Sequence, residues 1–379
     1  MRGIKFLLFV LSLLVVNFTS CSKESPVEPQ KNLTFEEKLQ KVLDDGIESQ
    51  HGKGVSAAIV FQNRELWSGT SGISFDTTPI TKDMIFCSGS VTKTFIAALC
   101  LQLSSEGAFS LDDSLHEWLP DFTNIDNSIT IRQLLYNTSG IYNITDNPAL
   151  WNAVFNNPAK LWTPEEIFPS FLELPYSTPG TGWYYSNTNY ILLGMIIAEA
   201  TQSSVSAELR NRFFQPLGLN STFFDGEETV PPKIAHGWFD LSGNGSYDDI
   251  SLIPRTGIYS VLWTSAAIFC TAEDLAKWSS ALFRGAVLDQ ASLDQMLTPC
   301  CTMPGTNDVG CGMGVFLIGP SNSTGAELIG YTGRTFGYLT TMFYLPDYGT
   351  SVVVMINEDN TACLDVITTN LTLEVINEG

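Results

Sequence analysis

The sequence predicts an α+β protein whose central antiparallel sheet is formed from both chain ends and flanked by helices. Segments with strand character occur between residues 55 and 69 and again between 313 and 356, while the region between them is mostly helical and broken by long loops. Strands at both ends around a helical middle indicate one sheet, with a large, mostly helical region inserted into the chain and packed against it. We expect a cleft between the sheet and the insertion, where ligands commonly bind.

The N-terminal elements follow from the spacing of apolar residues. Residues 35–48 carry apolar side chains at helical spacing and predict an amphipathic helix. Residues 55–61 and 65–69 have strand character, and the polar residues 62–64 between them predict the turn of a β-hairpin.

The C-terminal part predicts the rest of the sheet. Four runs alternate or are apolar throughout: residues 313–318, 326–331, 337–344 and 351–356. A last amphipathic helix over residues 362–376 closes the chain. We expect one domain over residues 34–379, with an α/β part (34–80 and 304–379) and a mostly helical part (81–303).

The first residues are typical of an export signal. Arg2 and Lys5 precede an apolar run, residues 6–16, that is too short to span a bilayer and fits a signal-peptide core. Small residues just before Cys21 resemble a bacterial lipoprotein cleavage site, which would make residues 1–21 the signal peptide and Cys21 the lipidated N-terminus. Residues 22–33 predict a tether. We expect an exported protein of the cell envelope, in the periplasm or at the outer membrane, anchored through Cys21; secretion with ordinary cleavage nearby is the alternative.

Charge and composition exclude some classes of partner. The chain has 379 residues with 19 Lys+Arg against 40 Asp+Glu, a formal charge of −21, whereas nucleic-acid binding needs a basic surface. The three histidines, His51, His116 and His236, lie far apart without metal-ligand spacing. We therefore expect no nucleic acid, no metal and no cofactor.

Eight cysteines in an exported chain raise the question of disulfides. If Cys21 carries lipid, seven remain, and at least one of them is unpaired. The most favoured bridge joins Cys300 or Cys301 to Cys311 and closes a loop that contains proline and glycine.

The first motif with chemical meaning is Ser90-Val91-Thr92-Lys93, at the start of a long apolar run. A helix beginning there places Ser90 and Lys93 one turn apart on the same face. Burial disfavours the charged form of a lysine, and a neutral amine can take the proton of a serine hydroxyl. A solvated Lys93 at a helix start is the alternative, because Ser-x-x-Lys also occurs by chance.

Two further motifs lie far along the chain. Tyr185 and Asn187 follow a Pro/Gly-rich loop; Tyr185 could relay a proton as a phenolate stabilised by Lys93, and Asn187 could hold a substrate amide. At the end of a predicted strand, the run Tyr331-Thr332-Gly333-Arg334 offers small residues that let a substrate approach the strand edge. Taken singly, these motifs also fit an aromatic surface loop and a plain glycine-rich turn.

Together the motifs appear in the order Ser-x-x-Lys, Tyr-x-Asn and x-Thr-Gly. In order and spacing the chain resembles the serine β-lactamase and penicillin-binding protein superfamily, in particular the branch of class C β-lactamases, DD-carboxypeptidases and family VIII esterases. Further matches cover most of the mature chain: residues 89–95, 111–113, 119–120, 129–135, 138–140, 185–190 and 216–219.

The resemblance implies acyl transfer through a covalent ester on Ser90. Lys93 and Tyr185 would move the proton, and the backbone N–H groups of Ser90 and Arg334 would form the oxyanion hole. Asn187, with the run from Tyr331 to Arg334, would bind the substrate, a small molecule or peptide that could derive from peptidoglycan.

The chain departs from the pattern at two places in the third motif. Tyr331 stands where this branch usually has lysine or histidine, so a positive charge for a substrate carboxylate is missing. Arg334 stands where a small residue is usual, and its guanidinium either holds that carboxylate or points to solvent.

Three functions remain open from the sequence. The first is a hydrolase of D-amino-acid peptides or amides, of the DD-carboxypeptidase or β-lactamase type. The second is a family VIII-type carboxylesterase, favoured by the uncharged Tyr331. The third is a non-catalytic envelope protein that keeps the fold, against which the intact serine, lysine, tyrosine and asparagine speak.

Overall fold

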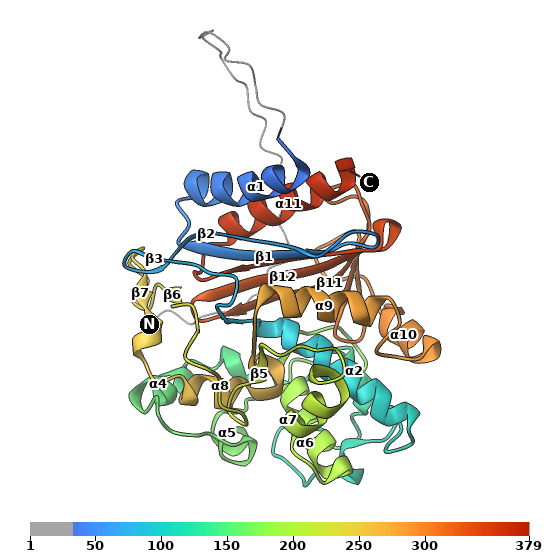
Figure 1. Ribbon diagram of the computed structural model, residues 1–379. Helices are drawn as coiled ribbons and strands as arrows, with labels where there is room; N and C mark the ends of the chain where they lie inside the picture. The colour runs from blue at the N-terminus through green and yellow to red at the C-terminus, as the bar shows by residue number, and fades with distance from the viewer. Residues whose placement is uncertain (1–32, 379) are drawn as a thin grey trace, which may run out of the picture.

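An eight-stranded antiparallel sheet organises the protein in this computed structural model, which describes residues 33–378 (Figure 1). The order across the sheet is β3-β2-β1-β13-β12-β11-β10-β9. Its strands are β1 (Gly54–Val60), β2 (Trp67–Phe75), β3 (Thr78–Pro79), β9 (Val309–Cys311), β10 (Phe316–Ile318), β11 (Leu328–Thr335), β12 (Tyr338–Leu345) and β13 (Thr350–Ile356). β1 pairs with β13, so the two chain ends meet in mid-sheet as predicted.

Two helices from opposite ends of the chain cover one face of the sheet. α1 (Phe35–Gln50) and α11 (Thr361–Glu378) lie side by side above the strands (Figure 1). α1 begins at a capping box, in which Thr34 and Glu37 satisfy each other's backbone N–H groups. Its buried Leu39 and Leu43 pack with apolar side chains of β1, β13 and α11 in a core of their own.

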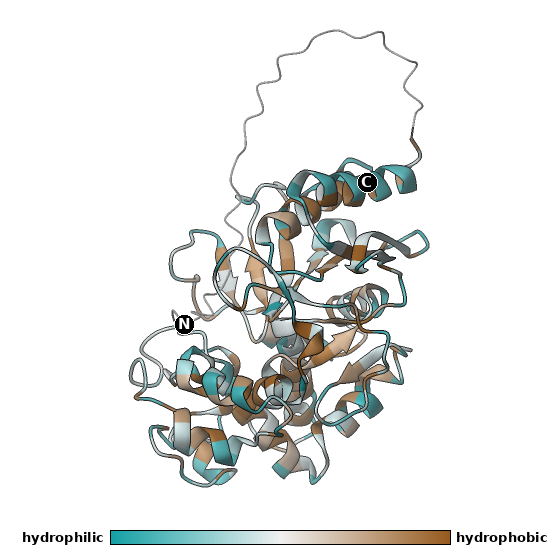
Figure 2. Cartoon of the chain, turned by 90° about the vertical axis from the view of Figure 1, so that its left-hand side faces the viewer, coloured by the Kyte–Doolittle hydropathy of each residue, from teal (hydrophilic) through white to brown (hydrophobic). Residues whose placement is uncertain are grey.

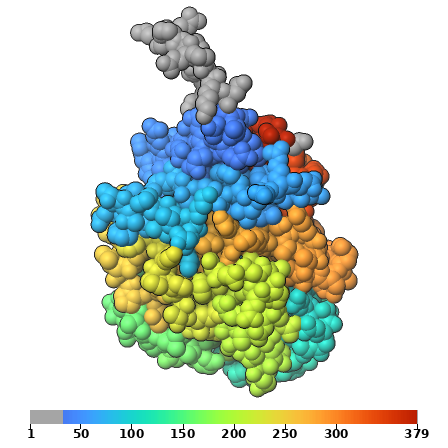
Figure 3. Space-filling model, viewed as in Figure 1, coloured from blue at the N-terminus to red at the C-terminus, as the bar shows by residue number. Residues whose placement is uncertain are grey.

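The helical region lies against the other face of the sheet. Its helices are α2 (Thr92–Ser105), α3 (Ile131–Leu135), α4 (Pro148–Asn156), α5 (Pro164–Phe171), α6 (Asn187–Thr201), α7 (Val205–Leu209), α8 (Thr256–Leu262), α9 (Ala272–Phe283) and α10 (Gln290–Leu297). The hydrophobic residues concentrate on the strands and on the inner sides of the helices (Figure 2). In the space-filling view the first strands and α1 form the upper surface and the insertion the lower one (Figure 3).

Two details of the insertion go beyond what could be predicted from the sequence. α9 packs directly on β1, β12 and β13, so it belongs to the layer that covers the sheet although it lies within residues 81–303. Short strands also occur in this region and form two small sheets: β4 (Phe86–Cys87), β8 (Ile268–Cys270) and β5 (Thr222–Phe224); β6 (Trp238–Phe239) and β7 (Asp248–Asp249). Two or three residues are too few to show a periodicity.

The predicted disulfide does not appear. Cys300, Cys301 and Cys311 are free thiols, as are the other cysteines within residues 33–378. The predicted signal peptide, Cys21 and nearly all of the tether lie outside the described residues. Within residues 33–378 no helix is long and apolar enough to cross a membrane.

Candidate active site

Ser90 lies in a single turn of 3₁₀ helix, η1 (Gly89–Val91), that leads directly into α2. The predicted helix therefore begins as expected, and it brings Ser90 and Lys93 to the same side one turn apart. Ser90 is partly exposed, whereas the Lys93 side chain is completely buried. The candidate nucleophile Ser90 is thus accessible to solvent, and the amine of Lys93 lies buried behind it.

Lys93 is held by three oxygen atoms. Its Nζ lies 2.7 Å from Oδ1 of Asn187, 2.8 Å from the carbonyl oxygen of Ser265 and 3.1 Å from Oγ of Ser90. Burial sets the pKa of Lys93 well below its usual value, so the neutral amine is favoured. A neutral amine has two hydrogens, which the Asn187 and Ser265 acceptors take, and its lone pair then faces the Ser90 hydroxyl.

Tyr185 approaches Ser90 from the loop before α6. Its phenol oxygen lies 2.7 Å from Oγ of Ser90, and Nζ of Lys93 sits 4.9 Å from the centre of its ring. Burial raises the pKa of Tyr185, and hydrogen bonding to Ser90 offsets this only in part. The predicted phenolate is therefore wrong: Tyr185 is a neutral phenol that can donate to Ser90, because the neighbouring Lys93 carries no charge to stabilise an anion.

Asn187 is the first residue of α6, and both polar atoms of its side-chain amide are bonded within the chain. Oδ1 accepts from Lys93, Nδ2 donates to the Thr145 hydroxyl at 2.8 Å, and the side chain is buried. The backbone N–H of Asn187 donates to Oδ1 of Asn143 at 2.9 Å. The expectation that Asn187 holds a substrate amide is thus not supported; the residue positions the lysine.

Tyr331, on β11, is buried behind Tyr185 rather than open to a substrate. Its side chain lies close enough to Tyr185 for the two phenols to shift each other's pKa, and its ring stacks on Phe316 with centroids 4.4 Å apart. Burial raises its pKa well above the usual tyrosine value, so it too is neutral. Tyr331 supports Tyr185, and direct substrate contact is not the role that its position suggests.

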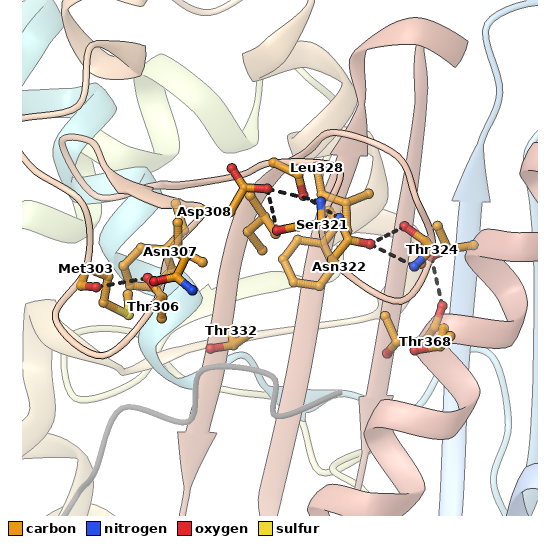
Figure 4. Close-up of a pocket in the computed structure, with 17 residues that line it drawn as sticks. Met303, Thr306, Asn307, Asp308, Ser321, Asn322, Thr324, Leu328, Thr332 and Thr368 are labelled. Carbon is orange, nitrogen blue, oxygen red and sulfur yellow. Dashed lines mark hydrogen bonds between the residues drawn. The ribbon is translucent and has the colours of Figure 1, made fainter. Parts of the chain in front are cut away.

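Thr332 faces away from Ser90. It lines a pocket of about 250 Å³ on the α11 side of the sheet, together with Thr368 of α11 (Figure 4). Its cross-strand neighbour Thr341 has its hydroxyl 2.8 Å from that of Thr368. Because successive side chains of a strand point to opposite faces, the inward Tyr331 excludes an inward Thr332. The structure therefore does not bring the Thr332 hydroxyl to the candidate nucleophile.

The backbones of β11 and η1 touch at two glycines. A Cβ atom on Gly333 would lie 2.0 Å from the Ser88 carbonyl oxygen and 3.2 Å from the Ser90 nitrogen. A Cβ on Gly89, whose φ is +56°, would lie 2.7 Å from the Arg334 nitrogen. These approaches place the backbone nitrogens of Ser90 and Arg334 at the same contact between η1 and β11, as the expected oxyanion hole requires.

The Arg334 side chain is already paired. Its guanidinium donates to the Asp359 carboxylate at 2.7 Å, and about a third of the side chain is exposed. The sequence predicts a guanidinium that either holds a substrate carboxylate or points to solvent. The ion pair with Asp359 agrees with neither role.

Sequence reasoning missed the residues that hold the site from behind. Asn143 and Thr145 bind Asn187, and they lie in or next to a 3₁₀ turn, η3 (Ile144–Asp146), with no pattern that marks them. Ser265 contributes a backbone carbonyl, which any residue type supplies. Within residues 33–378 no cluster of metal-ligating side chains occurs.

A sheet built from both chain ends, a helical insertion and the row of serine, lysine and tyrosine define a member of the serine β-lactamase and penicillin-binding protein superfamily. More specifically, the chain belongs to the Beta-lactamase family, which it matches over residues 39–374.

Known proteins support this at the level of single relatives. The chain is 25% identical over 293 residues to "Penicillin-binding protein 4*" of Bacillus subtilis, covering 74% of this chain and 62% of that protein. It is similar in structure to the D-amino acid amidase of Ochrobactrum anthropi SV3 (28% identity, TM-score 0.78, 91% and 99% covered). A D-stereospecific amidohydrolase from Streptomyces gives 29% identity and a TM-score of 0.76, with 86% and 97% covered.

Coverage differs between the two kinds of relative. The chain spans 62%, 50% and 52% of the length of three curated relatives that it matches. It spans nearly the whole of the two amidohydrolase structures.

Proposed function

We propose that this protein is a serine hydrolase that forms an acyl-enzyme on Ser90 and acts on amides of D-amino acids or on peptides that contain them. The observation that carries the proposal is the row formed by Tyr185, Ser90 and Lys93, in which the phenol oxygen of Tyr185 and Nζ of Lys93 both lie within hydrogen-bond distance of Oγ of Ser90. Each group in the row has its partner before a substrate arrives, which favours proton transfer without rearrangement.

In the proposed reaction Lys93 takes the proton of the Ser90 hydroxyl while Oγ attacks the substrate carbonyl carbon. The N–H groups of Ser90 and Arg334 stabilise the oxyanion. When the C–N bond breaks, Tyr185 gives its proton to the leaving nitrogen and recovers one from the protonated Lys93. Water then attacks the carbonyl carbon of the Ser90 ester while Lys93 takes one of its protons. The bond between that carbon and Oγ of Ser90 breaks, Oγ receives the proton from Lys93, and the carboxylic acid leaves with the enzyme restored.

Two observations support an amide with a free amino group as the substrate. Lys93 is buried and neutral, and Arg334 is paired with Asp359, which disfavours selection of a substrate carboxylate. The Asp146 carboxylate lies close enough to Tyr185 for its charge to contribute to the raised pKa of the phenol. A negative group beside the site favours a substrate ammonium, and the amidohydrolase neighbours act on D-amino-acid derivatives according to their names.

A family VIII-type esterase is the second candidate, because the uncharged Tyr331 removes the usual anchor for a carboxylate. Steady-state kinetics distinguish these candidate functions when they are measured on D-phenylalanine amide, L-phenylalanine amide, a D-Ala-D-Ala peptide and p-nitrophenyl butyrate. We expect the highest kcat/KM on the D-amide. A preference for the butyrate ester would favour the esterase, and no turnover of any of the four would favour the non-catalytic protein.

We also propose that the protein is exported and anchored to the envelope membrane through lipid on Cys21, as the sequence predicts. Expression with an alkyne-tagged fatty acid should label the wild-type chain and not Cys21→Ser. A Cys21→Ser protein that still takes up the label would remove the proposal.

A further inference from the structure

Three cysteines lie together at one edge of the sheet, away from Ser90, Lys93 and Tyr185. Cys300 and Cys301 follow α10, and Cys311 ends β9. Within a hairpin of only twelve residues, the chain places three thiols that the proposed hydrolase mechanism does not use.

A β-bulge brings these residues together. The Cys300 N–H donates to the Cys311 carbonyl at 2.9 Å, and the Cys311 N–H donates to the Cys301 carbonyl, also at 2.9 Å. The next residues along, Thr302 and Gly310, form a regular antiparallel bridge. Two residues on one strand thus oppose one residue on the other, the defining feature of a bulge.

The three thiols form a row with Cys301 in the middle. The sulfur of Cys301 lies 3.5 Å from that of Cys300, and the Cys301 thiol is close enough to Cys311 to contribute to the raised pKa of that thiol. Exposure falls along the row, since Cys300 is exposed, Cys301 half-buried and Cys311 buried.

Three thiols can pair in more than one way, and the backbone geometry disfavours a disulfide between Cys300 and Cys301. Adjacent residues joined by a trans peptide have Cα atoms about 3.8 Å apart, shorter than the roughly 4.4–6.8 Å that disulfides span. A Cys300–Cys301 bridge is therefore strained. Residues facing each other on antiparallel strands are about 4.5–5.5 Å apart, which suits a disulfide to Cys311. Of the two residues that oppose Cys311, Cys301 is the less exposed one and the one near both other thiols, so it is the favoured partner.

We propose that Cys301 and Cys311 are a redox-active pair that forms a disulfide by exchange with a small-molecule or protein disulfide, while Cys300 stays an exposed free thiol. The Cys301 thiolate attacks the donor R–S–S–R, a mixed disulfide forms and one R–SH leaves. The Cys311 thiolate then attacks the Cys301 sulfur and displaces the second R–SH. Two protein thiols are oxidised, the donor disulfide is reduced to two thiols, and two protons are transferred with them.

The bridge would fix the strand that supports the candidate site. Cys311 on β9 stands opposite Phe316 on β10, and Phe316 stacks on Tyr331, which lies close to Tyr185. Closing the loop removes conformational freedom from the unfolded chain, so the oxidised protein should melt a few degrees higher. Burial raises the pKa of Cys311, so the second step of the exchange should quicken as pH rises.

The test is a disulfide map of the full chain equilibrated with oxidised or reduced glutathione, with free thiols blocked before digestion. Cleavage before aspartates separates residues 294–307, which hold Cys300 and Cys301, from residues 308–346, which hold Cys311. We expect these two peptides to be joined after oxidation and separate after reduction.

Cysteine variants identify the pair and serve as matched controls. Cys300→Ser should leave the cross-link intact, whereas Cys301→Ser and Cys311→Ser should each abolish it. A cross-link lost in Cys300→Ser, or no joined peptides in the oxidised wild type, would overturn the proposal. The mapping needs no substrate, so its result is independent of the proposed hydrolase activity.

Discussion

At the scale of single residues, the charge states of Lys93 and Tyr185, on either side of Ser90, decide what the site can do. Burial holds Lys93 in its neutral form and Tyr185 in its protonated form, and both groups lie within hydrogen-bond distance of the same serine oxygen. A neutral base and a neutral acid on either side of one hydroxyl are the pair that acyl transfer requires. Arginine cannot play the first role, because it does not lose its proton at accessible pH.

Replacing Lys93 by arginine should therefore lower kcat by about 10²–10⁴-fold, the usual worth of a general base. In the wild type, Lys93 is active only when deprotonated, so its lowered pKa predicts an acidic limb in kcat/KM well below pH 10.5. The raised pKa of Tyr185 moves the alkaline limb above pH 10. A pH–rate profile checks both limbs, and a maximum confined to acidic pH would contradict the neutral lysine.

The hydroxyl of Tyr331 should matter more than its bulk. Tyr331→Phe keeps the stack on Phe316 but removes the hydroxyl that lies close enough to Tyr185 to influence its pKa, and we expect about a tenfold loss in kcat. Tyr338→Phe is the matched control, since it removes another buried tyrosine hydroxyl, bonded to the Ala235 carbonyl. Equal effects of the two variants on kcat would mean that the Tyr331 hydroxyl is only structural.

At the scale of elements, the site depends on how closely η1 and β11 approach each other. Gly89 and Gly333 allow this approach because any side chain at either position would meet the backbone of the other element.

Gly89→Ala tests this contact. The new Cβ would lie 2.7 Å from the Arg334 nitrogen, so we expect a loss in kcat of about 10²–10³-fold, as when one oxyanion donor is removed. Gly107→Ala is the control, because its φ is also positive (+81°) but its Cβ would meet nothing within 4 Å. The control should lose about 1 kcal/mol of stability and little activity. Unchanged kinetics in Gly89→Ala would show that the contact does not align the donors.

Long elements could be predicted from the sequence because their periodicity repeats. The helix after Ser90, the helix at residues 35–50 and the strands at both chain ends are where the apolar spacing indicates. The directions in which side chains point were harder to predict from the sequence. Asn187 turned inward to Lys93 and Thr332 outward to α11, since each direction depends on packing between segments far apart in the sequence.

At the scale of the whole molecule, the fold places a buried ionisable group between two layers. Lys93 sits in the core between the sheet and the helical insertion, fixed by oxygens from α6 and from the Ser265 segment. The sequence motif alone predicts the serine and lysine, but the groups that hold the amine come from three separate segments and include a backbone carbonyl. For that reason Ser90, Lys93 and Tyr185 could be predicted from the sequence, whereas the residues that support them could not.

Folding should consequently depend on pH through Lys93. Its native pKa is lowered, so between that value and the ordinary 10.5 the unfolded chain binds a proton that the folded chain lacks. Stability therefore rises with pH in this window, by at most about 1.4 kcal/mol per pH unit. Denaturant unfolding from pH 8 to 10 should show a steeper rise for the wild type than for Lys93→Met. Groups common to both proteins cancel in the difference, and parallel curves would argue for a charged lysine in the folded protein.

The central claim, a covalent ester on Ser90, is tested most directly by mass spectrometry of the intact protein after reaction with a fluorophosphonate or a penicillin. We predict a mass increase of one adduct in the wild type, located on the peptide with Ser90, and none in Ser90→Ala. An unlabelled wild type, or an adduct that persists in Ser90→Ala, would contradict the assignment of Ser90 as the nucleophile.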